Sequence, residues 1–368
     1  MDMECVRPTL LLDEALCRKN IQHIAAKALK SNVRLRPHFK THQSHEIGRW
    51  FREEGVDRCT VSSIKMATYF AADGWQDITV AFPLNFLETE EINRLAAVTR
   101  LHLCIDNSIS LQRLLARLKH AVHCFIEVDT GFGRTGINPI DHAAIDAILS
   151  IISSSPLLTF SGFMSHAGHS YACRSVAEIQ KIHEVTVGLM RKLGEYYRRD
   201  FPGLQLSIGD TPTCSVATDF NGIDEIRPGN LVFYDLSQCV IGSSAIEQIA
   251  IAMACPVVAL YPERQEVIVH GGGVHFSKDF LRRQDGTIVY GEVVRLHEKG
   301  WDLPPLPMYV KSLSQEHGIL YAPKEEVSKI KIGDLLGILP VHACLTADAM
   351  GEYVTLEGKR IAMMPKIL

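Results

Sequence analysis

One lysine stands among histidines and an arginine in the segment RPHFKTHQ, residues 36–43. This lysine, Lys40, follows the alternating apolar run of residues 33–35, which predicts a short strand. In a barrel of parallel strands, the active site lies at the carboxyl ends of the strands. Crowding by Arg36 and His42 would favour the neutral amine, which can form a Schiff base with a carbonyl. A surface lysine beside a turn is the competing interpretation.

Glycines dominate the segment DTGFGRTG, residues 129–136. Their Gly-x-Gly-x-x-Gly spacing matches the dinucleotide-binding fingerprint, but the segment follows the fifth predicted strand rather than the first. In addition, Pro156 stands near the position where an acidic ribose ligand is expected. We therefore interpret the glycines as a tight turn at a barrel rim that presents Arg134 inward. A turn with a purely structural role explains the pattern equally well.

Two further segments could receive a phosphate group. SIGDTPT, residues 207–213, follows the seventh predicted strand, and RPGNLVFYD, residues 227–235, lies at the eighth. Backbone amides in such loops bind phosphate, and TIM barrels often bind it after strands seven and eight. The segment SHAGHSY, residues 165–171, follows the sixth strand and adds His166 and Tyr171. Either phosphate loop, taken alone, would more often be an ordinary turn.

His342 and Cys344 are separated by one residue in VHACLTAD, residues 341–348. On an extended backbone, residues i and i+2 face the same side. Imidazole and thiolate together suit Zn²⁺, and two protein ligands would leave coordination positions open, as a catalytic zinc requires. The competing interpretation is a buried cysteine beside a hydrogen-bonded histidine.

The elements that must position these segments form a regular series. Eight β-rich runs alternate with helical stretches such as residues 140–152, where apolar residues repeat at three- and four-residue spacing. This alternation predicts a parallel sheet with helical crossovers. Eight such units fit a TIM barrel over residues 12–245. An open doubly wound sheet is the alternative.

The remaining sequence has a different pattern. From residue 246 onward, β-rich runs are separated by glycine, proline and charged turns, which predicts a mostly antiparallel β-domain. The predicted domains are therefore residues 12–245, the barrel, and residues 246–368, the β-domain. Residues 1–11 are predicted to join the β-domain as an additional strand.

Composition excludes several classes of partner. Of the 368 residues, 46% are hydrophobic and 22% charged, so the chain can bury a large core. The formal net charge is -4 and no block of lysine and arginine occurs, so we expect no nucleic-acid partner. The acidic start MDMECVRPTLLLDE does not match a secretory signal, and no apolar run is long enough for a bilayer. We expect a cytoplasmic protein with no membrane partner, whose ten cysteines are reduced.

Taken in order, the segments resemble the fold-type III pyridoxal phosphate enzymes, specifically the D-serine dehydratase and D-threonine aldolase family. Alanine racemase is a more distant relative. The resemblance covers nearly the whole chain and is carried by RPHFKTHQ, VDTGFGRTG, SHAGHSY, SIGDTPT, EIRPGNLVFYD, GGGVHFSKD, QEHG and VHACLTAD. It implies an alanine racemase-like architecture, a TIM barrel followed by a β-domain, and a homodimer with active sites near the subunit interface.

The resemblance also implies roles for individual residues. The family's lysine that binds pyridoxal 5'-phosphate as a Schiff base matches Lys40, and its metal pair matches His342 and Cys344. The coenzyme-binding residues that it implies are Arg134, His166, Tyr171, Thr211, Gly229, Asn230 and Tyr234.

The cysteine of the metal pair points to one branch of the family. The aldolase branch resembles His-x-Asp with oxygen-preferring metals, whereas the dehydratase branch resembles His-x-Cys with zinc, and a thiolate favours Zn²⁺. The resemblance therefore implies a dehydratase that converts a D-3-hydroxy amino acid, such as D-serine or D-threo-3-hydroxyaspartate, to a 2-oxo acid and ammonia. D-threonine aldolase-type cleavage to glycine and an aldehyde, or amino-acid racemisation, are the alternatives. One departure is Gln43, where the family often has lysine.

Overall fold

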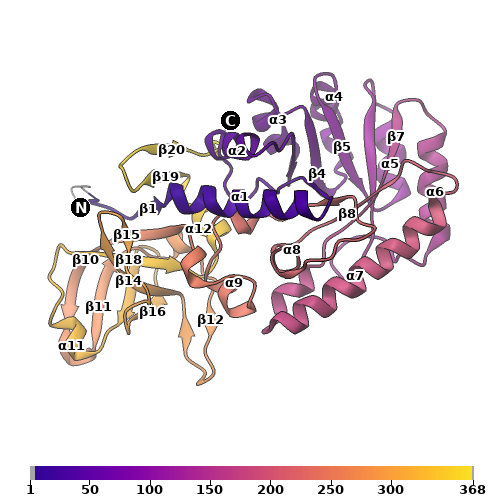
Figure 1. Ribbon diagram of the computed structural model, residues 1–368. Helices are drawn as coiled ribbons and strands as arrows, with labels where there is room; N and C mark the ends of the chain where they lie inside the picture. Colours follow the sequence, from indigo (N-terminus) through magenta and orange to yellow (C-terminus); the bar gives the residue numbers. More distant parts are fainter. Residues whose placement is uncertain (1–4, 367–368) are drawn as a thin grey trace.

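The computed structural model describes residues 5–366 (Figure 1). Residues 1–4 of the segment predicted to join the β-domain, and residues 367–368 at its end, lie outside the described part of the chain. Figure 1 shows a barrel with its surrounding helices beside a separate body of strands, with helix α1, Glu14–Lys30, running across both.

Eight parallel strands form the barrel in the order β2-β9-β8-β7-β6-β5-β4-β3. A parallel bridge between His38 and Thr60 returns the chain beyond β2 to β3 and nearly closes the barrel. The bridge stays isolated because Pro37 has no N–H to extend the ladder. The TIM barrel expected from the sequence is confirmed. Its strands are β2 (Arg34–Leu35), β3 (Arg58–Val61), β4 (Asp77–Pro83), β5 (Arg100–Ile105), β6 (Val122–Glu127), β7 (Leu158–Ser165), β8 (Gln205–Ile208) and β9 (Glu225–Ile226).

Helices connect these strands and cover the outside of the barrel (Figure 1). The helix expected over residues 140–152 is observed as α6, His142–Ser153, and it buries Ile145, Ile148, Leu149 and Ile152 on one face. Side-chain caps such as Ser63 and Asn107 begin the helices α3 and α5. The other barrel helices are α2 (His45–Glu53), α3 (Ile64–Ala72), α4 (Thr89–Ala96), α5 (Ser108–Leu115), α7 (Val176–Tyr197), α8 (Thr211–Val216) and α9 (Leu236–Ile241).

The second body is an antiparallel sheet that closes on itself. Its strands β10-β11-β17-β16-β14-β18 pair in that order, and β18 pairs again with β10. The antiparallel β-domain expected from the sequence is thus confirmed. These strands are β10 (Ile251–Tyr261), β11 (Glu266–His270), β14 (Gly291–His297), β16 (Tyr309–Leu313), β17 (His317–Tyr321) and β18 (Leu335–Pro340). Shorter elements are α10 (Gly273–Phe276), β12 (Leu281–Arg282), β13 (Ile288–Val289), β15 (Gly300–Trp301), α11 (Lys324–Val327), α12 (Ala343–Met350), β19 (Glu352–Thr355) and β20 (Arg360–Ala362).

The amino-terminal strand belongs to this second sheet. Strand β1, Thr9–Leu12, pairs antiparallel with β10 and parallel with β19. The chain then enters α1, where the Asn20 side chain donates to the carbonyl of Gln248 at 2.9 Å. Strand β1 and helix α1 therefore tie the two bodies together.

Two general expectations concern the whole chain. All ten cysteines are free thiols, and most are buried. No helix within residues 5–366 has the length and apolar character that crossing a membrane requires.

Candidate active site

The predicted coenzyme residues lie at the carboxyl ends of the barrel strands, where such barrels carry their chemistry. Because these strands are parallel, their carboxyl ends meet at one rim. The predicted residues, in chain order, are Lys40 after β2, Arg134 after β6, His166 and Tyr171 after β7, Thr211 after β8, and Gly229 and Asn230 after β9.

His38 lies among the charged groups of this rim. Burial lowers the pKa of His38, and the positive charges of Lys40, Arg227 and Arg134 lower it further. Burial likewise lowers the pKa of His166 to about 3, with the charges of Arg134, Lys40 and Arg227 adding to the effect. The backbone N–H of Lys40 donates to Nδ1 of His38 at 3.3 Å, so the His38 ring lies beside the loop that carries the lysine. Both imidazoles are neutral at pH 7, and the two guanidinium groups supply positive charge that suits a phosphate.

The neighbours expected around Lys40 are only partly correct. The Arg36 side chain turns into the barrel interior, where its Nε donates to Glu225 Oε2 at 2.7 Å and its other nitrogen pairs with Asp77. The His42 ring packs against Phe39, with centroids 4.6 Å apart. Arg36 and Lys40 differ because Arg36 directly follows β2 and is buried, whereas Lys40 lies in the turn beyond it and is exposed. The cations that face the same rim as Lys40 are instead Arg134 and Arg227.

The loops after β8 and β9 hold each other through Thr211. The Oγ1 atom of Thr211 accepts the backbone N–H groups of Gly229 at 3.4 Å and Asn230 at 3.0 Å. The backbone N–H of Thr211 in turn points at the hydroxyl of Tyr171, 3.3 Å away. Although the Tyr171 side chain is 39% exposed, its hydroxyl is enclosed, and burial raises its pKa. A cradle of backbone N–H groups with two hydroxyls suits a phosphate.

Gly229 and Tyr234 have defined places beside this cradle. A Cβ on Gly229 would lie 2.8 Å from the carbonyl oxygen of His38, so only glycine lets the two loops approach this closely. Tyr234 has a left-handed φ of 49°. Its hydroxyl lies 3.1 Å from the Ser215 hydroxyl, one helical turn beyond Thr211.

The glycine-rich loop that carries Arg134 turns around Asp129. The carboxylate of Asp129 accepts the backbone N–H groups of Gly131, Phe132 and Gly133 at 2.8 to 2.9 Å. Gly131 and Gly133 both have positive φ, which explains the glycines as a requirement of the turn. The loop holds its own carboxylate in the position where a dinucleotide site would hold phosphate.

The metal pair does not lie on a strand, so the argument from strand alternation was wrong. His342 is the residue before α12, with extended backbone, and Cys344 lies in the first turn of that helix. Burial opposes a charge on His342, but Cys344, Asp235 and Asp279 outweigh it and raise its pKa to about 10. Burial also opposes the Cys344 thiolate, yet His342 lowers the pKa of Cys344. The two side chains therefore face each other at the start of the helix, and each favours the charged form of the other.

The metal pair and the coenzyme cradle touch each other. Thr41, the residue after Lys40, places its Oγ1 atom 3.3 Å from Cys344 Sγ. The Asn230 amide points its Nδ2 atom at the same sulfur, 3.6 Å away. Cys344 thus contacts the lysine loop of the barrel and the cradle loop at once, and the two predicted clusters form one site.

Two carboxylates that have no role in the sequence analysis complete this site. Asp279 Oδ2 lies 2.7 Å from Nδ1 of His342 and fixes the orientation of that ring. Asp235 Oδ2 accepts both the Ala343 backbone N–H at 2.9 Å and the Asn230 amide at 2.6 Å. Asp279 lies in the segment GGGVHFSKD, which carried part of the family resemblance, but its 63-residue separation from His342 gives no spacing signal.

A hollow on the molecule lies away from this site. It has a volume of about 430 Å³ and is lined by residues 31–32, 198 and 218–224. These residues precede strands β2, β8 and β9, so the hollow lies at the amino ends of the strands. We assign the chemistry to the opposite rim, because barrels of this kind carry it at the carboxyl ends and the charged groups gather there.

Family models match nearly the whole described chain. The model described as alanine racemase, N-terminal domain, matches residues 12–237, which is more than half of the sequence. The model described as putative serine dehydratase domain matches residues 250–356. The chain belongs to the fold-type III family of pyridoxal phosphate enzymes.

Individual family members are similar along their full length. The chain is 27% identical to the D-serine dehydratase of Dictyostelium discoideum, over 95% of this chain and 93% of that protein. It is 29% identical to the D-threo-3-hydroxyaspartate dehydratase of Delftia sp. (strain HT23), over 95% and 94%. A cysteine-to-alanine mutant of D-threo-3-hydroxyaspartate dehydratase, solved in a metal-free form, superposes with a TM-score of 0.90. Its sequence is 27% identical, and the match covers 99% of this chain and 97% of that one.

The residues at the site fit the groups that this family membership implies. For the coenzyme, Lys40 offers an exposed side chain with no carboxylate partner among residues 5–366. The Oδ1 atom of Asn230 is buried and has no hydrogen-bond partner within that range. For a metal, the imidazole and thiolate of His342 and Cys344 are the nitrogen and sulfur donors that zinc prefers.

Proposed function

We propose that this protein is a pyridoxal phosphate- and zinc-dependent dehydratase that acts on a D-3-hydroxy amino acid, such as D-serine or D-threo-3-hydroxyaspartate. One observation carries the proposal. Cys344 contacts Thr41 at 3.3 Å and Asn230 at 3.6 Å. Thr41 directly follows the coenzyme lysine in the sequence, and Asn230 belongs to the phosphate cradle. A small substrate can therefore be held at its amino group and at its β-oxygen simultaneously.

The barrel residues would hold the coenzyme. Lys40 would bind its carbonyl carbon, and the N–H groups near Thr211, Gly229 and Asn230 would bind its phosphate, helped by the charge of Arg134. The coenzyme supplies an electron sink for the charge left when a bond at Cα breaks. The neutral His166 beside it can pack and donate a hydrogen bond without adding a second cation.

The carboxyl-terminal domain would hold the metal. His342 and Cys344 would bind Zn²⁺, with Asp279 orienting the imidazole through Nδ1 and leaving Nε2 for the ion. The metal supplies Lewis acidity, which makes a bound β-hydroxyl a better leaving group. A thiolate ligand favours Zn²⁺ over Mg²⁺ or Mn²⁺. The two relatives named as dehydratases, one of them solved in a metal-free form, support this reading.

The chain's own residues then account for the proton transfers. Lys40 Nζ, once released from the coenzyme, lies at the rim where it can accept the proton from the substrate Cα. That proton and the hydroxide from Cβ leave as water. The resulting enamine product takes up one water to give the 2-oxo acid and ammonia, so the reaction balances without an oxidant or reductant.

A substrate panel tests the proposal and its alternatives. The purified holoenzyme is incubated separately with D-serine, D-threonine and D-threo-3-hydroxyaspartate, and ammonia, 2-oxo acid, glycine and L-enantiomer are measured. We expect equal amounts of ammonia and 2-oxo acid from at least one of them. Glycine with an aldehyde would establish an aldolase, and the L-enantiomer without ammonia a racemase. Either result would overturn the proposal.

A further inference from the structure

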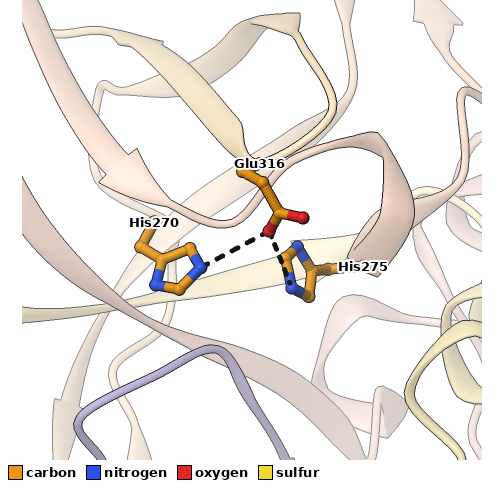
Figure 2. Close-up of side chains that lie close together, drawn as sticks. All are labelled: His270, His275 and Glu316. Carbon is orange, nitrogen blue, oxygen red and sulfur yellow. Dashed lines mark ion pairs between the residues drawn. The ribbon is translucent and has the colours of Figure 1, made fainter.

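Three metal-binding side chains gather at a second place, away from His342 and Cys344. Figure 2 shows His270 and His275 pointing at the carboxylate of Glu316. Glu316 Oε2 lies 3.5 Å from Nε2 of His270 and 3.7 Å from Nε2 of His275. One ligand atom from each residue lies within 4.8 Å of the other two. We propose that this His-His-Glu cluster is a second divalent-metal site, of the class that binds Zn²⁺.

Three glycines hold the two loops of this cluster against each other. His270 ends β11, His275 lies in α10, and residues 271–273 between them are all glycine. The backbone N–H of Gly271 donates to Glu316 O at 2.9 Å, and that of Gly273 donates to Ser314 O at 2.7 Å. A Cβ on Gly272 would collide with the carbonyl oxygen of Gln315. The main chains are thus in direct contact, and the ligands stand on a fixed frame.

The distances suit a tetrahedral ion. Bonds of about 2.0–2.2 Å place the ligand atoms of tetrahedral Zn²⁺ about 3.3–3.6 Å apart, close to the two separations observed. Two imidazoles and one carboxylate are a known zinc ligand set that leaves the fourth position to water. The donors are also accessible, since the side chains of His270 and Glu316 are 39% and 50% exposed.

One contact must change when an ion binds. The Gly272 backbone N–H points at Nδ1 of His275 at 3.1 Å, which places the ring proton on Nε2. Metal binding through Nε2 needs the other tautomer, so this contact must open. If the site binds no metal, the contact between Gly272 and His275 persists, and the three side chains form only an ion-pair cluster. This alternative is the one that the experiment must separate from metal binding.

The cluster is separate from the His342 and Cys344 pair but connected to it. Residues 270–279 reach both sites: His270 and His275 face Glu316, and Asp279 contacts His342. Helix α10 also packs on α12, where Thr346 Oγ1 donates to Phe276 O at 3.2 Å. An ion at the second site would stiffen the segment that orients the first.

Zinc titration in a Cys344→Ala background tests the proposal independently of the proposed function. The full-length holoenzyme is stripped with a chelator and titrated with Zn²⁺ in a calorimeter. We expect about one Zn²⁺ per chain in Cys344→Ala. Adding Glu316→Gln, or separately His270→Gln, should weaken that binding by at least the roughly 10–100-fold that the loss of outer-shell partners causes.

The His297→Ala variant in the same background is the matched control. His297 faces Asp302 at 3.7 Å in the same domain and is similarly exposed, so its loss should leave zinc binding unchanged. Circular dichroism verifies that each variant is folded. Failure of Cys344→Ala to bind Zn²⁺, or equal affinity with and without Glu316→Gln, would overturn the second site. The proposed dehydratase activity would survive both results.

Discussion

At the residue scale, the coenzyme lysine makes the sharpest claim. Replacing Lys40 by alanine removes an amine from the rim that also carries Arg134 and Arg227. We expect Lys40→Ala to lose covalent attachment of the coenzyme and at least about 1,000-fold in turnover, because catalysis through an enzyme-bound nucleophile is lost. The measurement is the near-ultraviolet absorption of coenzyme that stays attached to the denatured protein after borohydride reduction.

Lys30→Ala is the control, because Lys30 is an exposed lysine at the end of α1, before β2 and thus at the other end of the barrel. It should retain the reduced adduct in full. A Lys40→Ala protein that still carries the covalent adduct would show that another amine binds the coenzyme.

Asp279 is the second residue on which the site depends. Its contact of 2.7 Å with Nδ1 of His342 sets the tautomer that leaves Nε2 free for a metal. We expect Asp279→Ala to raise the Zn²⁺ concentration that restores half of the ammonia release by about 10–100-fold. Asp302→Ala, which removes an exposed carboxylate facing His297, should leave that concentration unchanged. Equal zinc requirements in both variants would refute the role of Asp279.

The sequence located part of this site and could not locate the rest. The ordered motifs predict Lys40, His342 and Cys344 as site residues, and their roles stay predictions. Asp279 was missed because 63 residues separate it from His342. The contact of Thr41 with Cys344 spans 303 residues and arises only when two domains pack. The wrong neighbours assigned to Lys40 came from treating residues close in sequence as close in space.

At the element scale, the approach of two loops controls the cradle. A Cβ on Gly229 would lie 2.8 Å from His38 O and 3.0 Å from His38 Cβ. We expect Gly229→Ala to push the lysine loop away from the cradle loop, at a cost of about 1–3 kcal/mol of stability, and to weaken coenzyme binding. The measurements are urea unfolding of the apoprotein and coenzyme titration.

Gly188→Ala serves as the control for this substitution. Gly188 lies within helix α7 and has no heavy atom within 4 Å of its added Cβ. Alanine there should raise the free energy of unfolding by roughly 0.5–1 kcal/mol and leave coenzyme binding unchanged. A Gly229→Ala variant with unaltered coenzyme affinity would contradict the cradle geometry.

The helices and strands were largely predictable, because the spacing of hydrophobic residues and the presence of turn residues are local features of the sequence. Eight barrel strands are observed, as the eight β-rich runs predict, although β2 and β9 have only two residues each. Pro37 and Pro228 follow these strands, and a proline cannot continue the ladder as a donor. In the β-domain, β18 begins at Leu335, directly after a turn in which Asp334 Oδ2 accepts the Lys331 N–H at 2.7 Å.

At the scale of the whole molecule, β1 joins the two bodies. Leu11 is fully buried beside Ala254 and Val354, and α1 follows two residues later. We expect Leu11→Ala to lower the free energy of unfolding by about 2–5 kcal/mol. Barrel and β-domain should still unfold in one transition. Leu29→Ala, at an 83% exposed position of α1, should change it by less than about 0.5 kcal/mol.

This prediction is checked by urea unfolding followed by both far-ultraviolet circular dichroism and coenzyme fluorescence. Two separate transitions in Leu11→Ala would show that β1 does not couple the bodies. The domain limits at residues 245 and 246, the homodimer and the cytoplasmic location stay predictions, since one chain does not test them.

The central claim is that an amine-held coenzyme and a metal act on one substrate at the same site. The most direct measurement is ammonia release from D-serine and D-threo-3-hydroxyaspartate by the holoenzyme after chelation, while coenzyme absorption is recorded. We predict that chelation abolishes ammonia release, that the coenzyme stays bound, and that Zn²⁺ restores the rate in the wild type but not in Cys344→Ala. Full ammonia release from metal-free protein would contradict this account.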